Sequence, residues 1–162
     1  MNRLKLGIVT CGFLGCSPVA PGTFGTLGGV LIAWALAPLE NYAVWVLAAA
    51  AAVYVLGRSL GDWAEQYAGG EDPGFFVLDE VCGYLLTIWW FEGPSLVALA
   101  VAFGAFRLFD IWKPGLVRRF DTMHGGDGIM LDDVFAGVYG LVIVMIPARL
   151  LIPDVWSLTA ST

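Results

Sequence analysis

Apolar stretches without a charged residue alternate with short polar segments along this chain. The uncharged blocks that could form membrane helices cover residues 24–39, 41–57, 81–91, 93–106 and 134–148. Each is somewhat shorter than the roughly 20 residues that a helix needs to cross about 30 Å of hydrocarbon. Because proline disrupts a helix interior, Pro38 and the Gly93-Pro94 pair predict turns between blocks. The pattern predicts an all-α bundle of four or five short membrane spans, in which the third block could also be a half-span or part of a re-entrant hairpin.

Composition supports a membrane location. Hydrophobic residues make up 59% of the 162 residues, charged residues make up 14%, and the mean hydropathy is +0.79. Soluble domains usually carry about a quarter charged residues. The net charge of −6 argues against nucleic-acid binding, because phosphate backbones attract basic surfaces. We therefore expect a single membrane-embedded domain over residues 1–162.

The few basic residues orient the predicted spans. With the N-terminus inside, residues 1–23, 58–80 and 107–133 form the cytoplasmic segments. These segments hold every Lys and Arg except Arg149. Cytoplasmic loops are enriched in Lys and Arg, so the polar loops are predicted to face the cytoplasm. Residues 1–16 are interpreted as a retained segment at the membrane surface or partly inserted in it.

Most acidic residues fall in the same cytoplasmic segments. Those near the ends of predicted helices are Asp79, Glu80, Asp110, Asp132 and Asp133. Carboxylates at the ends of apolar helices are costly unless they are solvated, paired or bound to a cation. They therefore suggest a shared acidic site, which would suit a hard divalent cation such as Mg²⁺. Helix capping is the alternative for the four acids that precede helices, whereas Asp110 follows one, where the dipole disfavours an anion.

Groups that suit a phosphate lie near these acids in the sequence. Arg107 and Lys113 flank Asp110, although Arg107 could instead pair with that carboxylate. Residues 20–29 could offer backbone N–H groups and the Thr23 hydroxyl to an anion at a helix N-terminus. Close helix packing through the glycines of this segment explains it equally well. His124, in a second glycine-rich loop, could bind phosphate, move a proton or lie in solvent.

Several nucleophile patterns of phosphatases are absent from the sequence. Cys11, Cys16 and Cys82 are not followed by an arginine six residues later, no Asp-x-Asp occurs, and one histidine cannot supply a pair. The cysteines are interpreted as small apolar side chains. Water positioned by a metal ion and carboxylates remains as the means of hydrolysis.

Four motifs occur in order along the chain. They are PVAPGTFGT at Pro18–Thr26, LDEV at Leu78–Val81 followed by Gly83, FRLFDIWKP at Phe106–Pro114, and GIMLDDVFAG at Gly128–Gly137. Together they resemble the phosphatidylglycerophosphatase A family of bacterial inner-membrane lipid phosphatases. The resemblance implies Mg²⁺-dependent hydrolysis of phosphatidylglycerophosphate to phosphatidylglycerol and phosphate, in phospholipid biosynthesis.

The resemblance also implies roles for particular residues. The matched catalytic acids are Asp79, Glu80, Asp110, Asp132 and Asp133. All of these except Asp110 are candidate metal ligands, and the matched groups on the phosphate side are Thr23, Arg107 and Lys113. Asp79 and Asp132 are expected to act at one metal ion, because neighbouring helices in a bundle lie about 8–10 Å apart.

Two other classes of protein remain open. A small ion- or proton-coupled transporter could use the same carboxylates as a pathway. The acids cluster toward one side with cations beside them, which fits a transporter less well. A structural membrane subunit would tolerate the loss of Asp79 and Asp132.

Overall fold

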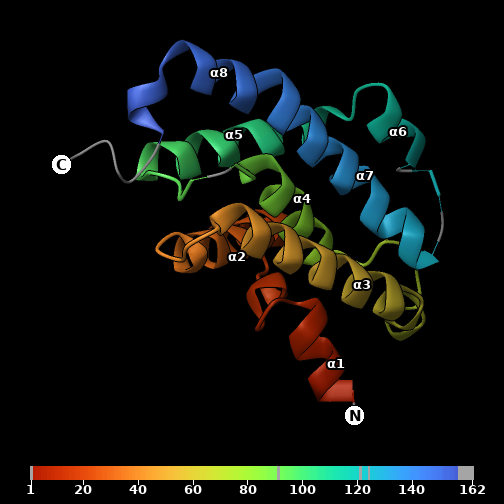
Figure 1. Ribbon diagram of the computed structural model, residues 1–162. Helices are drawn as coiled ribbons and strands as arrows, with labels where there is room; N and C mark the ends of the chain where they lie inside the picture. Colours follow the sequence, from red (N-terminus) through yellow and green to blue (C-terminus); the bar gives the residue numbers. More distant parts are fainter. Residues whose placement is uncertain (1, 91, 121, 124, 157–162) are drawn as a thin grey trace.

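The protein is all-helical over residues 2–90, 92–120, 122–123 and 125–156, which the computed structural model describes (Figure 1). In chain order the α-helices are α1 (Asn2–Val9), α2 (Pro21–Leu36), α3 (Tyr42–Ala68), α4 (Leu78–Ile88), α5 (Leu96–Trp112), α6 (Leu116–Phe120), α7 (Gly125–Tyr139) and α8 (Ile146–Leu151). A π-helical segment, Gly140–Met145, joins α7 to α8, and short 3₁₀ turns cover Leu14–Cys16 and Pro153–Val155. The predicted all-α fold is confirmed.

Helix α4 forms the centre of the bundle. Most of its residues are buried, and it packs against α2, α3, α5 and α7 (Figure 1). Its 11 residues give a length of about 16 Å at 1.5 Å per residue. That is roughly half of the 30 Å hydrocarbon thickness. Of the alternatives for the third apolar block, the half-span agrees with this length.

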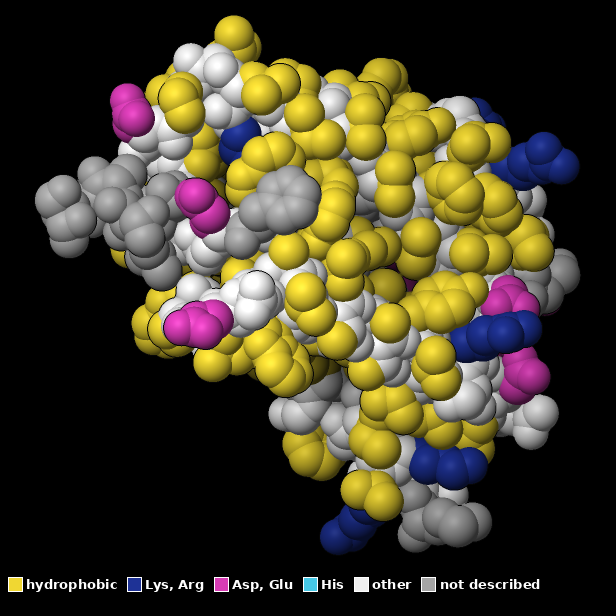
Figure 2. Space-filling view, viewed as in Figure 1, with side chains coloured by type: hydrophobic (Ala, Val, Ile, Leu, Met, Phe, Trp, Pro, Cys, Tyr) yellow, Lys and Arg dark blue, Asp and Glu magenta, His cyan; other side chains and the backbone are white. Residues whose placement is uncertain are grey.

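Two continuous helical segments are long and apolar enough to cross a membrane. They are Tyr42–Ala68 and Gly125–Leu151. Helices α2 and α5 are apolar but have only 16 and 17 residues. Figure 2 shows a face that hydrophobic side chains largely cover, with charged side chains mainly toward its margins. The structure thus supports a membrane protein, whereas the expected four or five short spans are not confirmed.

Local sequence explains where several helices begin and end. Helix α2 ends shortly before Pro38, and α5 begins just after Gly93-Pro94. Ser95 caps α5 by accepting a hydrogen bond from the N–H of Ala98 at 3.2 Å. Gly69 ends α3 in the left-handed region, with φ of 75°, where glycine has no Cβ penalty. The predicted turns at Pro38 and Gly93-Pro94 are confirmed.

Arg149 has a structural role at the C-terminal end of α4. Its guanidinium is buried and donates to the carbonyl oxygens of Ile88 at 3.2 Å and Trp89 at 3.0 Å. The last carbonyls of a helix have no partner within the helix, so this arginine satisfies two of them. The one basic residue expected on the opposite side therefore caps a buried half-length helix from within the protein.

Candidate active site

Three carboxylates from two helices meet at the N-terminal end of α4. Asp79 and Glu80 lie in the first turn of α4, and Asp133 lies in α7. One carboxylate oxygen from each lies within 4.8 Å of the others. These three residues are called the carboxylate cluster below. Their spacing and oxygen chemistry would suit a divalent cation.

Two glycines allow α4 and α7 to come close enough to form the carboxylate cluster. A Cβ at Gly83 of α4 would meet the backbone oxygen of Asp133, and a Cβ at Gly137 of α7 would meet the backbone of Gly83. A side chain at either position would push the helices apart. The glycines within the second and fourth sequence motifs thus serve the close approach that brings the acids together.

A cavity of about 380 Å³ adjoins the carboxylate cluster. The predicted site residues that line it are Asp79, Glu80, Arg107, Asp110, Lys113, Asp132 and Asp133. The first residues of α2, Pro21 and Gly22, line it as well. Thr23 follows them on α2 but is not among the described lining residues, so its predicted role stays a prediction.

Gly22 marks the point where α2 touches the site. A Cβ at this position would collide with the Glu80 carboxylate and lie 3.2 Å from Nη1 of Arg107. The other glycines of the segment pack against neighbouring elements: Gly25 lies against Val77, Gly28 against Cys11 and Gly29 against Tyr84. The alternative of close packing therefore explains Gly25, Gly28 and Gly29, whereas Gly22 borders the cavity.

Both predicted phosphate-side cations are paired with carboxylates. Arg107 pairs with Asp110 one turn later on α5, as the sequence alternative suggested. Nζ of Lys113 lies 2.7 Å from Oδ2 of Asp132. Lys113 also has a φ of 48°, an uncommon backbone conformation for a residue with a side chain. The two ion pairs hold positive charge at the cavity wall, beside the carboxylate cluster.

The structure corrects the expected position of Asp132 and Asp133. The apolar block predicted a helix from residue 134, but α7 begins at Gly125 and places both acids in its interior. They cannot cap its N-terminus. Consecutive helical residues point about 100° apart. Only Asp133 reaches the carboxylate cluster, and Asp132 is held by Lys113 beside it.

Burial governs the electrostatics at the start of α4, outside the two candidate spans. It raises the pKa of Asp79 well above its usual range, and the charge of Glu80 adds to the effect. Burial also raises the pKa of Glu80, while the hydrogen bond from Asp79 and the charge of Arg107 act in the opposite direction. Oε2 of Glu80 is buried and has no hydrogen-bond partner among the described residues. A buried carboxylate oxygen without a partner is costly, so the site fits a cation that would take this oxygen as a ligand.

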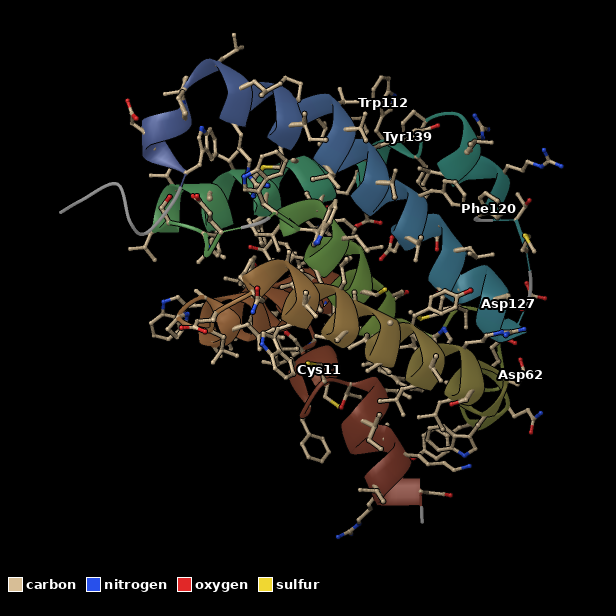
Figure 3. The ribbon with its side chains drawn as sticks, in the orientation of Figure 1. Cys11, Asp62, Trp112, Phe120, Asp127 and Tyr139 are labelled. Carbon is tan, nitrogen blue, oxygen red and sulfur yellow. The ribbon has the colours of Figure 1, made fainter. Side chains whose placement is uncertain are left out.

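A second set of polar contacts fixes the start of α7 to α3. Oδ1 of Asp62 accepts a hydrogen bond from the N–H of Gly126 at 3.1 Å, and Arg58 pairs with Asp127 at 2.6 Å. Figure 3 shows Asp62 and Asp127 together at this end of the two helices. This set was not predicted from the sequence, although the run of Gly, Gly and Asp at the start of α7 is a helix N-terminus signal. His124, just before α7, lies outside the described residues.

The cysteines and one serine pattern do not supply a nucleophile to the cavity. None of the three cysteines is among the described residues that line it. The chain does contain a Gly-x-Ser-x-Gly sequence at residues 57–61. Its serine, Ser59, lies within α3 and donates to the carbonyl of Leu56 at 2.9 Å, so it is not on a strand-to-helix elbow.

Comparison with known proteins gives matches over most of the chain. A family profile described as phosphatidylglycerophosphatase A matches residues 7–148. Two proteins named phosphatidylglycerophosphatase A are each 34% identical to this chain over the aligned residues. The one from Escherichia coli K12 aligns over 146 residues, 85% of this chain and 82% of the relative. The one from Haemophilus influenzae aligns over 126 residues, 77% of each chain.

A relative with a different name is similar to the same degree. This Bacteroides thetaiotaomicron protein, provisionally named phosphatidylinositol-3-phosphatase, is 36% identical over 144 residues, which cover 82% of this chain and 86% of the relative. No solved structure gives a significant match.

Proposed function

This chain belongs to the phosphatidylglycerophosphatase A family, and from that premise we propose that it hydrolyses phosphatidylglycerophosphate to phosphatidylglycerol and inorganic phosphate. Family membership supports a lipid phosphatase in the wider sense. The observation that carries the finer proposal is the carboxylate cluster in a cavity whose wall also holds Arg107 and Lys113. The reaction would serve phospholipid biosynthesis at the cytoplasmic face of the bacterial inner membrane.

The proposed cofactor is Mg²⁺, held by Asp79, Glu80 and Asp133, with Asp132 as a further candidate. Hard cations of this kind are commonly bound by one or two carboxylates together with water and substrate phosphate. The buried, unpartnered Oε2 of Glu80 supports a cation here. When bound, the ion would polarise the phosphoryl oxygens and lower the pKa of a coordinated water.

The chain's own cations and one helix end would bind the phosphate. Arg107 has five N–H donors and Lys113 has three, so each can bond a phosphate oxygen while keeping its carboxylate partner. The N-terminus of α2 lines the cavity at Pro21 and Gly22, and a helix N-terminus favours an anion. Placing positive charge where a phosphoryl group reacts is usually the largest part of catalysis in phosphoryl transfer.

A carboxylate that does not ligate the ion would accept the proton of the attacking water. A general base works best when its pKa lies near the operating pH. A carboxylate bound to a divalent cation loses basicity, so the base would be a site acid that does not ligate the ion. Asp110 and Asp132 would act by orienting Arg107 and Lys113. The proposed reaction involves no covalent phospho-enzyme.

Phosphate release by the purified protein tests the proposal. The assay uses phosphatidylglycerophosphate in detergent micelles, with Mg²⁺ or with EDTA, and phosphatidylinositol 3-phosphate as a second substrate. Asp133→Asn is compared with Asp154→Asn, a control at an exposed acid in the 3₁₀ turn Pro153–Val155. We expect Mg²⁺-dependent release from phosphatidylglycerophosphate that only Asp133→Asn abolishes. Release from phosphatidylinositol 3-phosphate alone would show that the substrate is wrong.

The comparisons give no support to the transporter alternative. The described acids of the site also gather at one end of the bundle, where α4 begins, and do not line a path through it. Cation flux into liposomes without lipid hydrolysis would support the transporter function instead.

A further inference from the structure

Two apolar grooves lie between helices on the outside of the bundle. The α2–α5 groove, of about 360 Å³, is lined by Leu27, Val30, Leu96, Leu99, Ala100 and Phe103. The α3–α7 groove, of about 530 Å³, is lined by residues of α3 and α7 and has Cys82 and Leu86 of α4 in its wall. By size and polarity, either groove could hold an acyl chain. The position of each groove relative to the polar cavity decides which of them suits the substrate.

The α2–α5 groove and the polar cavity are lined by successive turns of the same two helices, α2 and α5. Helix α2 lines the groove with Leu27 and the cavity with Gly22. Helix α5 lines the groove with Phe103 and the cavity with Arg107. Helical residues four apart lie on one face, one turn from each other. The apolar wall of α5 therefore leads within one turn to the cation proposed to bind phosphate.

The same register explains the position of Thr23. It lies four residues before Leu27 on α2 and directly after Gly22, so it falls between the groove and the cavity. Because Gly22 lies beside Arg107, the two helices come together at this point. A lipid lying in the groove with its phosphate in the cavity would pass Thr23, although Thr23 does not line the cavity itself.

The α3–α7 groove approaches the polar cavity on one helix only: on α4, Cys82 of the groove wall comes three residues after Asp79, which lines the cavity. No described residue of α3 lines the polar cavity. The basic residue that follows its wall residues on α3 is Arg58, which pairs with Asp127 and not with a group of the cavity. On α7, the groove residues Leu131 and Val134 flank Asp132 and Asp133 in sequence, so they point to the other side of that helix.

The distance along α5 from the far end of the α2–α5 groove to the cation of the cavity suits one leaflet of a bilayer. From Leu96 to Arg107, α5 advances about 16 Å, close to half of the 30 Å hydrocarbon thickness. Leu96 is 74% exposed and Leu27 is 40% exposed. An apolar surface of this kind beside a polar site is typical of a contact with lipid.

We propose that the α2–α5 groove holds an acyl chain of the phospholipid substrate while its phosphate lies at Arg107 and the carboxylate cluster. This inference rests on the proposed function, because it takes a phospholipid phosphomonoester as the substrate. It assigns Leu27, Val30, Leu99, Ala100 and Phe103 to acyl-chain binding and places Thr23 at the junction of groove and cavity. The lipid enters sideways from the bilayer between α2 and α5.

A pair of matched alanine substitutions tests the proposal. Ala100→Phe fills the α2–α5 groove, and Ala51→Phe fills the α3–α7 groove at an alanine that is also exposed. Each variant is assayed with dioleoyl phosphatidylglycerophosphate and with the deacylated, water-soluble headgroup phosphate. We expect Ala100→Phe to lower kcat/KM for the lipid by about tenfold or more while its rate on the deacylated substrate stays within about twofold of wild type. Ala51→Phe should leave both rates within about twofold of wild type.

The outcomes distinguish a failure of the groove assignment from a failure of the proposed function. Equal losses in the two variants, or a selective loss in Ala51→Phe, would overturn the assignment of the groove. Absence of phosphate release by the wild-type protein from both substrates would contradict the proposed function instead.

A second measurement addresses the groove without activity. A phosphatidylglycerol with a diazirine-labelled acyl chain is crosslinked to the protein in nanodiscs, and the sites are mapped by mass spectrometry. We expect crosslinks on α2 and α5 that Ala100→Phe reduces. Crosslinks confined to α3 and α7 would overturn the proposal.

Discussion

Replacing Asp79 by asparagine is expected to abolish phosphatase activity and at the same time to stabilise the metal-free protein. The change keeps the size of the side chain but removes a charge that is only 8% exposed to solvent. It also leaves the amide oxygen of Asn able to accept the hydrogen bond from the N–H of Glu80, which is 3.0 Å long in the wild type. The loss of charge is therefore the main difference between the two proteins.

The magnitude follows from the spacing of the carboxylate cluster. Two unit charges 4.8 Å apart, the upper limit of the cluster's oxygen separations, repel each other by about 3.5 kcal/mol at an effective dielectric constant of 20. Partial protonation reduces this repulsion, so we expect Asp79→Asn to raise the free energy of unfolding by about 1–3 kcal/mol in EDTA. For a chain of this size that is a rise in Tm of several degrees.

The pH dependence gives the sign of the effect. The pKa of Asp79 is higher in the folded protein than in the unfolded chain. Its contribution to stability is therefore fully present below the unfolded pKa and is lost as the pH rises through the folded pKa. In EDTA the wild-type Tm should fall as the pH rises from acid toward neutral, and the Asp79→Asn variant should show a smaller fall.

Thermal unfolding in detergent and phosphate release together form the assay. Mg²⁺ should raise the wild-type Tm, because a ligand that binds only the folded state stabilises it, and should raise that of the variant less. Loss of a group that binds the metal should reduce turnover by about a hundredfold or more. If Asp79 only caps α4, the variant will keep near-normal turnover and its Tm in EDTA will stay level or fall. That result would refute the reasoning.

Four further predictions follow from the site. Asp133→Asn should abolish turnover, whereas Asp132→Asn should mainly raise KM, because Asp132 orients Lys113. Equal losses of kcat in the two variants would show that both aspartates have the same catalytic role. Gly22→Ala should reduce kcat/KM by about tenfold or more by displacing Glu80 and Arg107, while Gly104→Ala, where an added Cβ meets nothing within 4 Å, should keep full activity. Replacing all three cysteines by alanine should preserve turnover, and its loss in a folded protein would indicate a thiol mechanism. On that cysteine-free background, a single cysteine introduced by Arg118→Cys should react with an impermeant reagent only after the cytoplasmic side is exposed. Labelling of intact cells from outside would show that the proposed orientation is wrong.

The sequence alone predicted the all-helical class, the family and most of the charged residues that line the cavity. These follow from local chemistry: apolar blocks favour helices in a membrane, and Pro38 and Gly93-Pro94 interrupt them. The acids and cations of the site were identifiable because charged residues are rare in this chain and must be paired, solvated or bound. Family motifs then gave these residues an order and an expected reaction.

Only the tertiary structure decided which acids meet. Hydropathy placed the start of the last helix block after the charges of Asp132 and Asp133, because it assigns each residue its own cost of transfer from water. Lys113, on another segment, offsets that cost for Asp132, so α7 continues through both acids. The facing glycines Gly83 and Gly137 then select Asp133 as the residue that reaches α4.

The partners of Arg149, at the other end of α4, could not be predicted from the sequence either. A count of charges could place Arg149 only on the opposite side of a membrane, whereas its buried guanidinium satisfies the last carbonyls of the half-length helix. Pairing between residues distant in sequence depends on how helices pack. The sequence therefore determines which side chains are available, and packing across α4, α5 and α7 decides which of them share a site.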